Sequence, residues 1–159
     1  MNRIVFVALC LFMLLGVLSV NVGVSQQMSD FYSADTFPSY LVFAEAGGHG
    51  LASVNYEYYF SHRVGLRVGY GIYIPVLLNF YFGKRYLLEL GAGMIFTQYN
   101  VAESFQGKQR TLLLGCTIGH KFQPIDGGVT LRYSFTPMFN PSNGKFKPMI
   151  GLSLGYAFK

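Results

Sequence analysis

Hydrophobic and polar residues alternate along most of the chain. In residues 128–139, GVTLRYSFTPMF, every second position from Val129 to Phe135 is apolar, whereas Thr130, Arg132 and Ser134 between them are polar. A repeat of two residues is typical of a β-strand with one apolar and one polar face. The apolar face is the core of a soluble sheet but the lipid side of a transmembrane barrel, so the fold depends on which face points inward.

Eight segments show this alternation: 40–46, 52–60, 64–72, 76–82, 86–97, 111–122, 129–138 and 149–158. The connections SHR, GKR and QPIDGG are tight, and YNVAESFQGKQR and FNPSNGKFK on the other side are longer. GGHG and YIP are short as well. Short periplasmic turns opposite longer outer loops are typical of outer-membrane barrels. The pattern predicts an all-β fold, an eight-stranded antiparallel up-and-down transmembrane β-barrel with both termini in the periplasm.

The two faces of these segments differ strongly. One face carries nearly all the large apolar residues, and the other carries ten glycines: Gly65, Gly69, Gly71, Gly83, Gly91, Gly93, Gly115, Gly119, Gly151 and Gly155. An eight-stranded barrel has room inside only for its own side chains, so the apolar set would overfill it, whereas glycine frees volume. Charged residues make up only 12% of the chain and aromatic residues 17%, and a water-facing surface normally carries far more charge. We therefore expect the apolar face to contact lipid.

The N-terminus has the features of a secretory signal. A basic start is followed by an apolar run over residues 4–20 and by small residues near a cleavage site before Gln26. We predict a cleaved signal peptide over 1–25, a periplasmic lead-in over 26–38 and the barrel domain over 39–159. An uncleaved anchor and lipidation at Cys10 are the alternatives. Cleavage leaves Cys116 alone, so the mature chain would have no internal disulfide.

Six charged residues fall on the inner face, three of each sign: Glu45, Glu57, Arg67, Glu89, Lys121 and Arg132. A loop of three residues, SHR, would set Phe60 opposite Val64 and Glu57 opposite Arg67, so these two charges are expected to pair. In the next hairpin, Phe82 opposite Tyr86 would place Asn79 beside Glu89. Buried charges need partners, so the set is interpreted as a barrel-interior charge network that fills a closed lumen. A proton or ion path is the alternative.

The sequence offers little catalytic chemistry. His49, His62 and His120 are not spaced like metal ligands, and no nucleotide-binding or redox motif occurs, so no cofactor, metal or catalytic residue is predicted. His49 in GGHG, at the outer rim, is the one histidine placed where a barrel enzyme could act on lipid, and Ser104 or Glu103 could reach it. The simpler interpretation is a residue of a tight turn.

Two pairs of cations close the longer loops: Lys108 and Arg110, and Lys145 and Lys147. These four side chains are possible contacts for the phosphates of lipid A. The loop tip 103–106 would remain available to a partner. The net charge of +5 includes no basic cluster dense enough for nucleic acid.

Several motifs carry a family resemblance: SVNYEYYFSHRVGLRVGYG, IPVLLNFYFGK, LELGAG, FQPIDGGVTLRYSFTPMF and IGLSLGYAFK. Over residues 40–159 the chain resembles a functionally uncharacterised family of small outer-membrane β-barrel proteins of Gram-negative bacteria. The resemblance implies fold and location, with no established activity. The last strand is similar to the signal read by the barrel-assembly machinery, although Lys159 follows the aromatic Phe158.

The functional prediction is an integral outer-membrane protein with a closed lumen and a structural or loop-mediated role, without catalysis. One alternative is a lipid-modifying outer-membrane barrel enzyme. The other is a soluble, lipocalin-like periplasmic barrel whose apolar face surrounds an apolar ligand.

Overall fold

Ten β-strands account for most of residues 37–97 and 112–159, the part of the chain that the computed structural model describes. They are β1 (Tyr40–Gly47), β2 (Leu51–Ser61), β3 (Val64–Gly71), β4 (Tyr73–Gly83), β5 (Tyr86–Thr97), β6 (Leu112–Phe122), β7 (Gly128–Phe135), β8 (Met138–Phe139), β9 (Phe146–Lys147) and β10 (Ile150–Phe158). The predicted signal peptide, most of the lead-in and the loop 98–111 lie outside the described residues. The described residues contain no helix long and apolar enough to cross a membrane.

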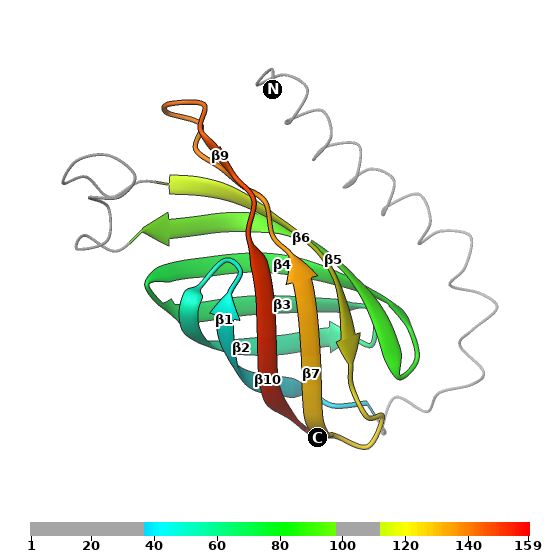
Figure 1. Ribbon diagram of the computed structural model, residues 1–159. Coiled ribbons are helices and arrows are strands. Elements are labelled where there is room, and N and C mark those ends of the chain that lie inside the picture. Colours follow the sequence, from blue (N-terminus) through cyan, green and yellow to red (C-terminus); the bar gives the residue numbers. More distant parts are fainter. Residues whose placement is uncertain (1–36, 98–111) are drawn as a thin grey trace. The chain divides into compact units, whose positions relative to one another are not determined.

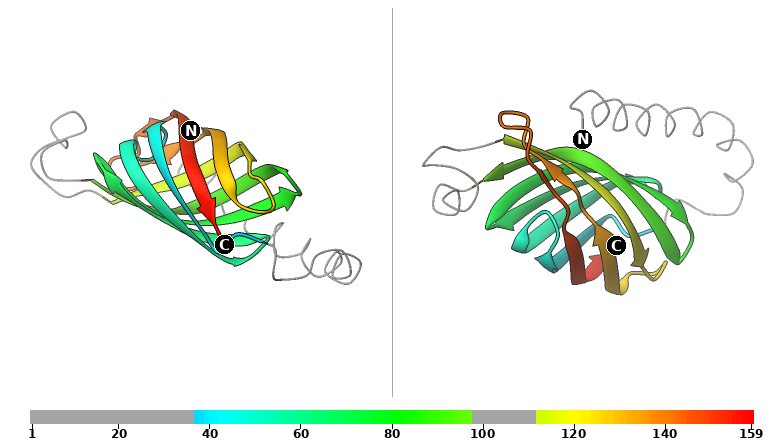
Figure 2. Two further views of the ribbon diagram at one scale, coloured as in Figure 1. Left: turned by 90° about the horizontal axis from the view of Figure 1, so that it is seen from below. Right: turned by 45° about the horizontal axis from the view of Figure 1, so that its top comes forward.

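The long strands form a closed antiparallel barrel, as Figures 1 and 2 show. Strands β1 to β7 pair in sequence order, β7 pairs with β10, and β10 returns to β1. The chain is therefore an all-β protein with eight barrel strands, β1 to β7 and β10, which confirms the predicted fold class. We call the rim that carries Tyr40, Phe158 and the turns after β2, β4 and β6 the terminal rim, and the opposite rim the loop rim.

The short strands β8 and β9 extend the hairpin between β7 and β10 at the loop rim. The sequence predicted one strand over 129–138, but β7 ends at Phe135. Pro137 has no N–H to donate, so the ladder is interrupted there. Cys116 N instead donates to Pro137 O at 3.1 Å, and Thr136 N donates to Met149 O at 2.8 Å.

Of the two predicted hairpin registers, one is confirmed at its charged pair and the other is wrong. Glu57 lies opposite Arg67 as expected, although a bulge places Ser61, rather than Phe60, across from Val64. In the β4–β5 hairpin the prediction is wrong: Tyr81, rather than Asn79, lies opposite Glu89. The reason is Gly83, which adopts φ +118° and pairs with Leu87, so the loop comprises residues 84–86 instead of 83–85.

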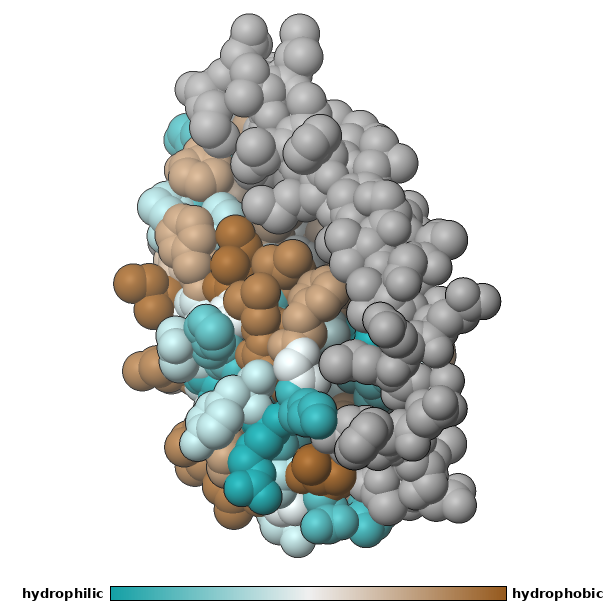
Figure 3. All heavy atoms as spheres, turned by 90° about the vertical axis from the view of Figure 1, so that its right-hand side faces the viewer, coloured by the Kyte–Doolittle hydropathy of each residue, from teal (hydrophilic) through white to brown (hydrophobic). Residues whose placement is uncertain are grey.

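The apolar face of the strands points outward. In β7, Leu131 and Tyr133 are 55% and 58% exposed, whereas Thr130 and Arg132 are 2% and 4% exposed. The same alternation runs through β1, β2 and β10. In Figure 3 apolar side chains, in brown, project from part of the coloured surface, beside hydrophilic residues in teal. This arrangement contradicts the alternative of a soluble barrel with its apolar face inside.

Two apolar clusters close the interior near its ends. At the terminal rim, Phe37 packs against a cluster of Leu41, Phe43, Tyr59, Tyr81, Leu87 and Ala157. Toward the loop rim a second cluster comprises Tyr73, Ile95, Leu113 and Met138. The sequence pattern did not predict that these apolar residues point inward. Buried polar and charged residues lie beside these clusters, with Glu57 opposite Leu41 and Lys121 opposite Leu87.

Candidate functional site

The six inner-face charges predicted from sequence all lie inside the barrel. Their residues are at most 4% exposed. They come from six different strands: Glu45 from β1, Glu57 from β2, Arg67 from β3, Glu89 from β5, Lys121 from β6 and Arg132 from β7. They form two groups of ion pairs, each electrically balanced.

The first group surrounds Glu57, near the terminal rim. Lys121 Nζ lies 2.8 Å from Glu57 Oε2. Asn79 Nδ2 donates to Glu57 Oε1 at 2.8 Å, and the hydroxyl of Tyr81 donates to the same oxygen. One cation and two neutral donors therefore hold this carboxylate, which offsets the cost of its burial.

Tyr59 and Tyr81 complete this group, and the sequence analysis had not singled them out. Lys121 Nζ lies 4.8 Å from the ring centre of Tyr59 and 4.4 Å from that of Tyr81, within the range of cation–π attraction. Lys121 also donates to the Tyr59 hydroxyl. That hydroxyl lies 2.7 Å from Gln123 Oε1 and 3.2 Å from Glu57 Oε2, so its single proton serves one of the two at a time. The sequence signal that could have identified them is their position: Tyr59 and Tyr81 lie on the same strand faces as the inward charged residues.

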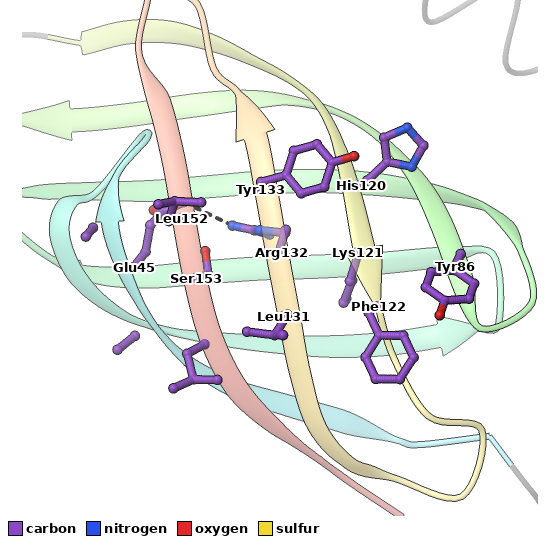
Figure 4. Close-up of a pocket in the computed structure, with 13 residues that line it drawn as sticks. Glu45, Tyr86, His120, Lys121, Phe122, Leu131, Arg132, Tyr133, Leu152 and Ser153 are labelled. Carbon is purple, nitrogen blue, oxygen red and sulfur yellow. Dashed lines mark hydrogen bonds and ion pairs between the residues drawn. The ribbon is translucent and has the colours of Figure 1, made fainter.

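The second group lies in the middle of the barrel and centres on Arg132. Its Nη2 lies 3.0 Å from Glu45 Oε1, and its Nη1 lies 3.0 Å from Glu89 Oε1. Arg67 Nη2 also pairs with Glu45, through Oε2. The guanidinium carbons of Arg132 and Arg67 lie 4.5 and 5.0 Å from the ring centre of Phe43. Figure 4 shows Arg132 reaching from β7 toward Glu45 on β1.

The predicted pairing of Glu57 with Arg67 is therefore wrong, although their register is right. Arg67 turns to Glu45 and, through Nε, to Asn55 Oδ1 at 3.0 Å. Glu57 bonds Lys121 on the far wall instead. In a barrel this narrow, long side chains from any two strands can meet across the lumen. Adjacency on the sheet does not decide the partner.

His49 lies in the turn between β1 and β2, as the simpler interpretation predicted. Its turn lies at the loop rim, but its ring is fully buried, with Nδ1 3.4 Å from Thr117 Oγ1. A Cβ on Gly115 would lie 2.7 Å from His49 Nε2, so the glycine makes room for the ring. Burial lowers the pKa of His49 well below its usual value of 6.5, and the cations Arg67 and Arg132 lower it further. The ring of His49 is therefore not exposed at the loop rim.

The other candidate residues are dispersed. His62 lies exposed in the turn after β2, and His120 lies exposed on the outer face of β6. Within residues 37–97 and 112–159, no group of three or more His, Cys, Asp or Glu could hold a metal ion. Lys145 and Lys147 lie on the β8–β9 hairpin at the loop rim. Lys108, Arg110, Ser104 and Glu103 lie outside the described residues.

A closed eight-stranded antiparallel barrel with an apolar outer surface and a charged, side-chain-filled interior has the architecture of small membrane barrels. Among solved structures, the chain is similar to the N-terminal β-barrel domain of Pseudomonas aeruginosa OprF, with a TM-score of 0.56 and 17% sequence identity. The match covers 75% of this chain and 95% of that domain. At this identity the likeness establishes the fold. No family model matches the chain, and no curated protein is significantly similar to it in sequence.

Proposed function

We propose that this protein is an integral protein of the bacterial outer membrane, with a closed lumen and a structural or loop-mediated role rather than a catalytic one. The observation that carries this proposal is the outward apolar face. Large apolar side chains on β2, β7 and β10 are about half exposed, and in water this surface would be strongly unfavourable. The likeness to the N-terminal β-barrel domain of OprF supports a location of the barrel in the outer membrane.

Aromatic side chains at the terminal rim support a membrane interface there. The rings of Tyr40 and Phe158 stack with centroids 5.0 Å apart, and Tyr86 and Phe122 lie 5.3 Å apart. Girdles of aromatic residues at the lipid–water boundary are typical of transmembrane barrels. Because β1 begins and β10 ends on this side, the terminal rim would face the periplasm and the loop rim the cell exterior.

The filled interior supports a closed lumen. Two apolar clusters and two balanced groups of ion pairs occupy it. The burial of His49 removes the residue on which the alternative of a lipid-modifying enzyme rested. The loops at the outer rim would then be the part of the protein that meets a partner.

Fractionation and gel mobility test the proposal together. The mature protein should remain in the outer-membrane fraction after carbonate extraction. It should also migrate faster in unboiled than in boiled samples, because a folded barrel resists detergent. Recovery in the soluble extract, or the same mobility with and without boiling, would contradict the proposal.

A further inference from the structure

The outer surface of the barrel has a groove of about 860 Å³ that crosses four adjacent strands. It runs from β1 over β10 and β7 to β6 and reaches the first residue of β5. Its outward lining includes Ala44 and Ala46, Leu152 and Leu154, Tyr133 and Tyr86. Figure 4 shows Tyr86, Phe122 and His120 at the β5–β6 end of the groove. Leu131 and Leu152 lie between this end and β1. The groove is thus an apolar channel on the surface that the proposed function places in lipid.

The hollow has a simple origin in the sequence. Ala44 and Ala46 lie directly opposite Leu154 and Leu152 on β10. Two methyl groups beside two long side chains leave space above β1. An extended chain of methylene groups fits such a channel, because it can contact apolar atoms along the whole length of the groove.

The β5 end of the groove is positively charged. Tyr86, which lines it, directly follows Lys84 and Arg85 in the turn after β4, and both are exposed. The turns and C-terminus of the terminal rim carry two further cationic side chains, Arg63 and Lys159. Lys159 itself lies 3.4 Å from Asp126, whereas Lys84 and Arg85 stand directly next to Tyr86 of the groove. The charge next to the groove therefore suits an anion.

We propose that the groove and the Lys84–Arg85 turn together bind one anionic phospholipid of the leaflet at the terminal rim. An acyl chain would lie against Ala44 and Ala46, and the headgroup phosphate would contact the turn. Arg85 offers a planar fork of donors to phosphate, and charge-assisted bonds of this kind are stronger than neutral ones. The proposal rests on the proposed function insofar as the barrel must span a membrane.

A second copy of this chain fits the groove less well. Two copies in one membrane share their orientation, so a two-fold axis would lie along the membrane normal. A symmetric contact through the groove would then bring two Lys84–Arg85 turns toward each other on the same rim. Like charges repel, whereas an anionic headgroup neutralises them.

Lipid retention tests the inference. The folded barrel is reconstituted in vesicles of phosphatidylcholine and phosphatidylglycerol in equal parts, extracted in mild detergent and measured by native mass spectrometry. The wild type should retain phosphatidylglycerol in preference to phosphatidylcholine. Lys84→Gln with Arg85→Gln should lower phosphatidylglycerol retention by about tenfold, as expected for the loss of charge-assisted bonds. Ala44→Leu with Ala46→Leu should lower the retention of both lipids.

A matched control separates the groove from added bulk elsewhere. Ala92→Leu adds a side chain of the same size on β5 outside the groove and should not alter retention. Heat-modifiable mobility of every variant confirms an inserted barrel, so a failure of the proposed function is seen separately. Equal retention of the two lipids by the wild type, or unchanged phosphatidylglycerol retention in the Lys84/Arg85 variant, would overturn the inference. Lys84 and Arg85 are exposed turn residues, so the test does not depend on whether the variant with leucine at positions 44 and 46 folds.

Discussion

Lys121 is the residue on which the terminal-rim ion pair depends, because it is the one cation within bonding distance of Glu57 among the described residues. Glu45, in contrast, is shared by Arg67 and Arg132. Loss of Lys121 leaves Glu57 with neutral donors only: Asn79, Tyr81 and the hydroxyl of Tyr59. A buried charge that loses its partner is costly. The two acidic residues therefore differ in how much they tolerate the loss of a cation.

We predict that Lys121→Met destabilises the barrel by about 3–5 kcal/mol, the usual cost of breaking a buried ion pair. Adding Glu57→Gln should recover part of this loss, because the stranded charge is removed. Urea titration of the folded barrel in detergent measures both effects. As a control, Glu45→Gln should not rescue Lys121→Met. Additivity of Lys121→Met and Glu57→Gln would refute the pairing.

His49 gives the protein a predictable response to acid. Its folded-state pKa lies below 6.5, so below that pH the unfolded chain takes up a proton that the folded barrel excludes. Stability is therefore full above about pH 6.5 and falls as the pH drops, by up to about 1.4 kcal/mol per pH unit. His49→Gln should flatten this part of the unfolding profile, measured between about pH 7.5 and 5. His120→Gln, on the outer surface, is the control. Parallel profiles for wild type and His49→Gln would show that the buried imidazole is not responsible.

At the scale of elements, the hairpins determine which residues face one another. The β4–β5 hairpin places Glu89 opposite Tyr81 because Gly83 belongs to the strand ladder. A Cβ at Gly83 would lie 2.3 Å from the backbone oxygen of Tyr86, in addition to the strain of φ +118°. Gly128 has nearly the same φ, +120°, but the nearest atom to its Cβ would be 3.8 Å away. A comparison of alanine substitutions at the two glycines therefore distinguishes backbone strain from a steric clash of the added Cβ.

We predict that Gly83→Ala and Gly128→Ala both lower stability by about 1–3 kcal/mol through strain at positive φ, with an added cost at Gly83 from the contact with Tyr86. Thermal unfolding of the folded barrel in detergent measures the two variants side by side. If Gly128→Ala is as destabilising as Gly83→Ala, the tight closure of the β4–β5 hairpin is not the reason for the glycine.

At the scale of the whole barrel, a path for water from one rim to the other would have to pass two apolar clusters and two groups of ion pairs. The cluster near the terminal rim surrounds the Glu57 group, the Arg132 group lies further along the barrel, and Tyr73, Ile95 and Leu113 form the cluster toward the loop rim. Opening such a path would require ion pairs to separate in a confined space. The barrel is thus built as a packed body.

We predict negligible conductance for the pure, folded protein in planar bilayers. The narrow strand number leaves the lumen no wider than its own side chains, and the apolar clusters would exclude hydrated ions. Detergent without protein is the baseline, and heat-modifiable mobility confirms that the sample is folded. Stable and reproducible current steps would contradict the closed lumen.

The alternation of apolar and polar residues was sufficient to predict the barrel, because a strand has a period of two and each face meets one environment. Sequence spacing also placed Glu57 opposite Arg67 and assigned Glu45, Glu89, Lys121 and Arg132 to the inner face. These features depend on neighbours along one strand or one hairpin. They are local, and the sequence by itself determined them.

The partners of those charges were decided only by the tertiary structure. Glu57 meets Lys121, and Glu45 meets Arg132, across 64 and 87 residues of sequence. Closure of the barrel brings β6 across the lumen from β2, and it places β7 two strands from β1, with β10 between them. The same closure turned His49 inward beside Thr117 and left the groove beside Ala44 and Ala46. Such contacts depend on the diameter and stagger of the barrel and on local features such as the positive φ of Gly83. The alternation of apolar and polar residues carries no information on these features. A period of two specifies a face, whereas only the closed barrel specifies what that face meets.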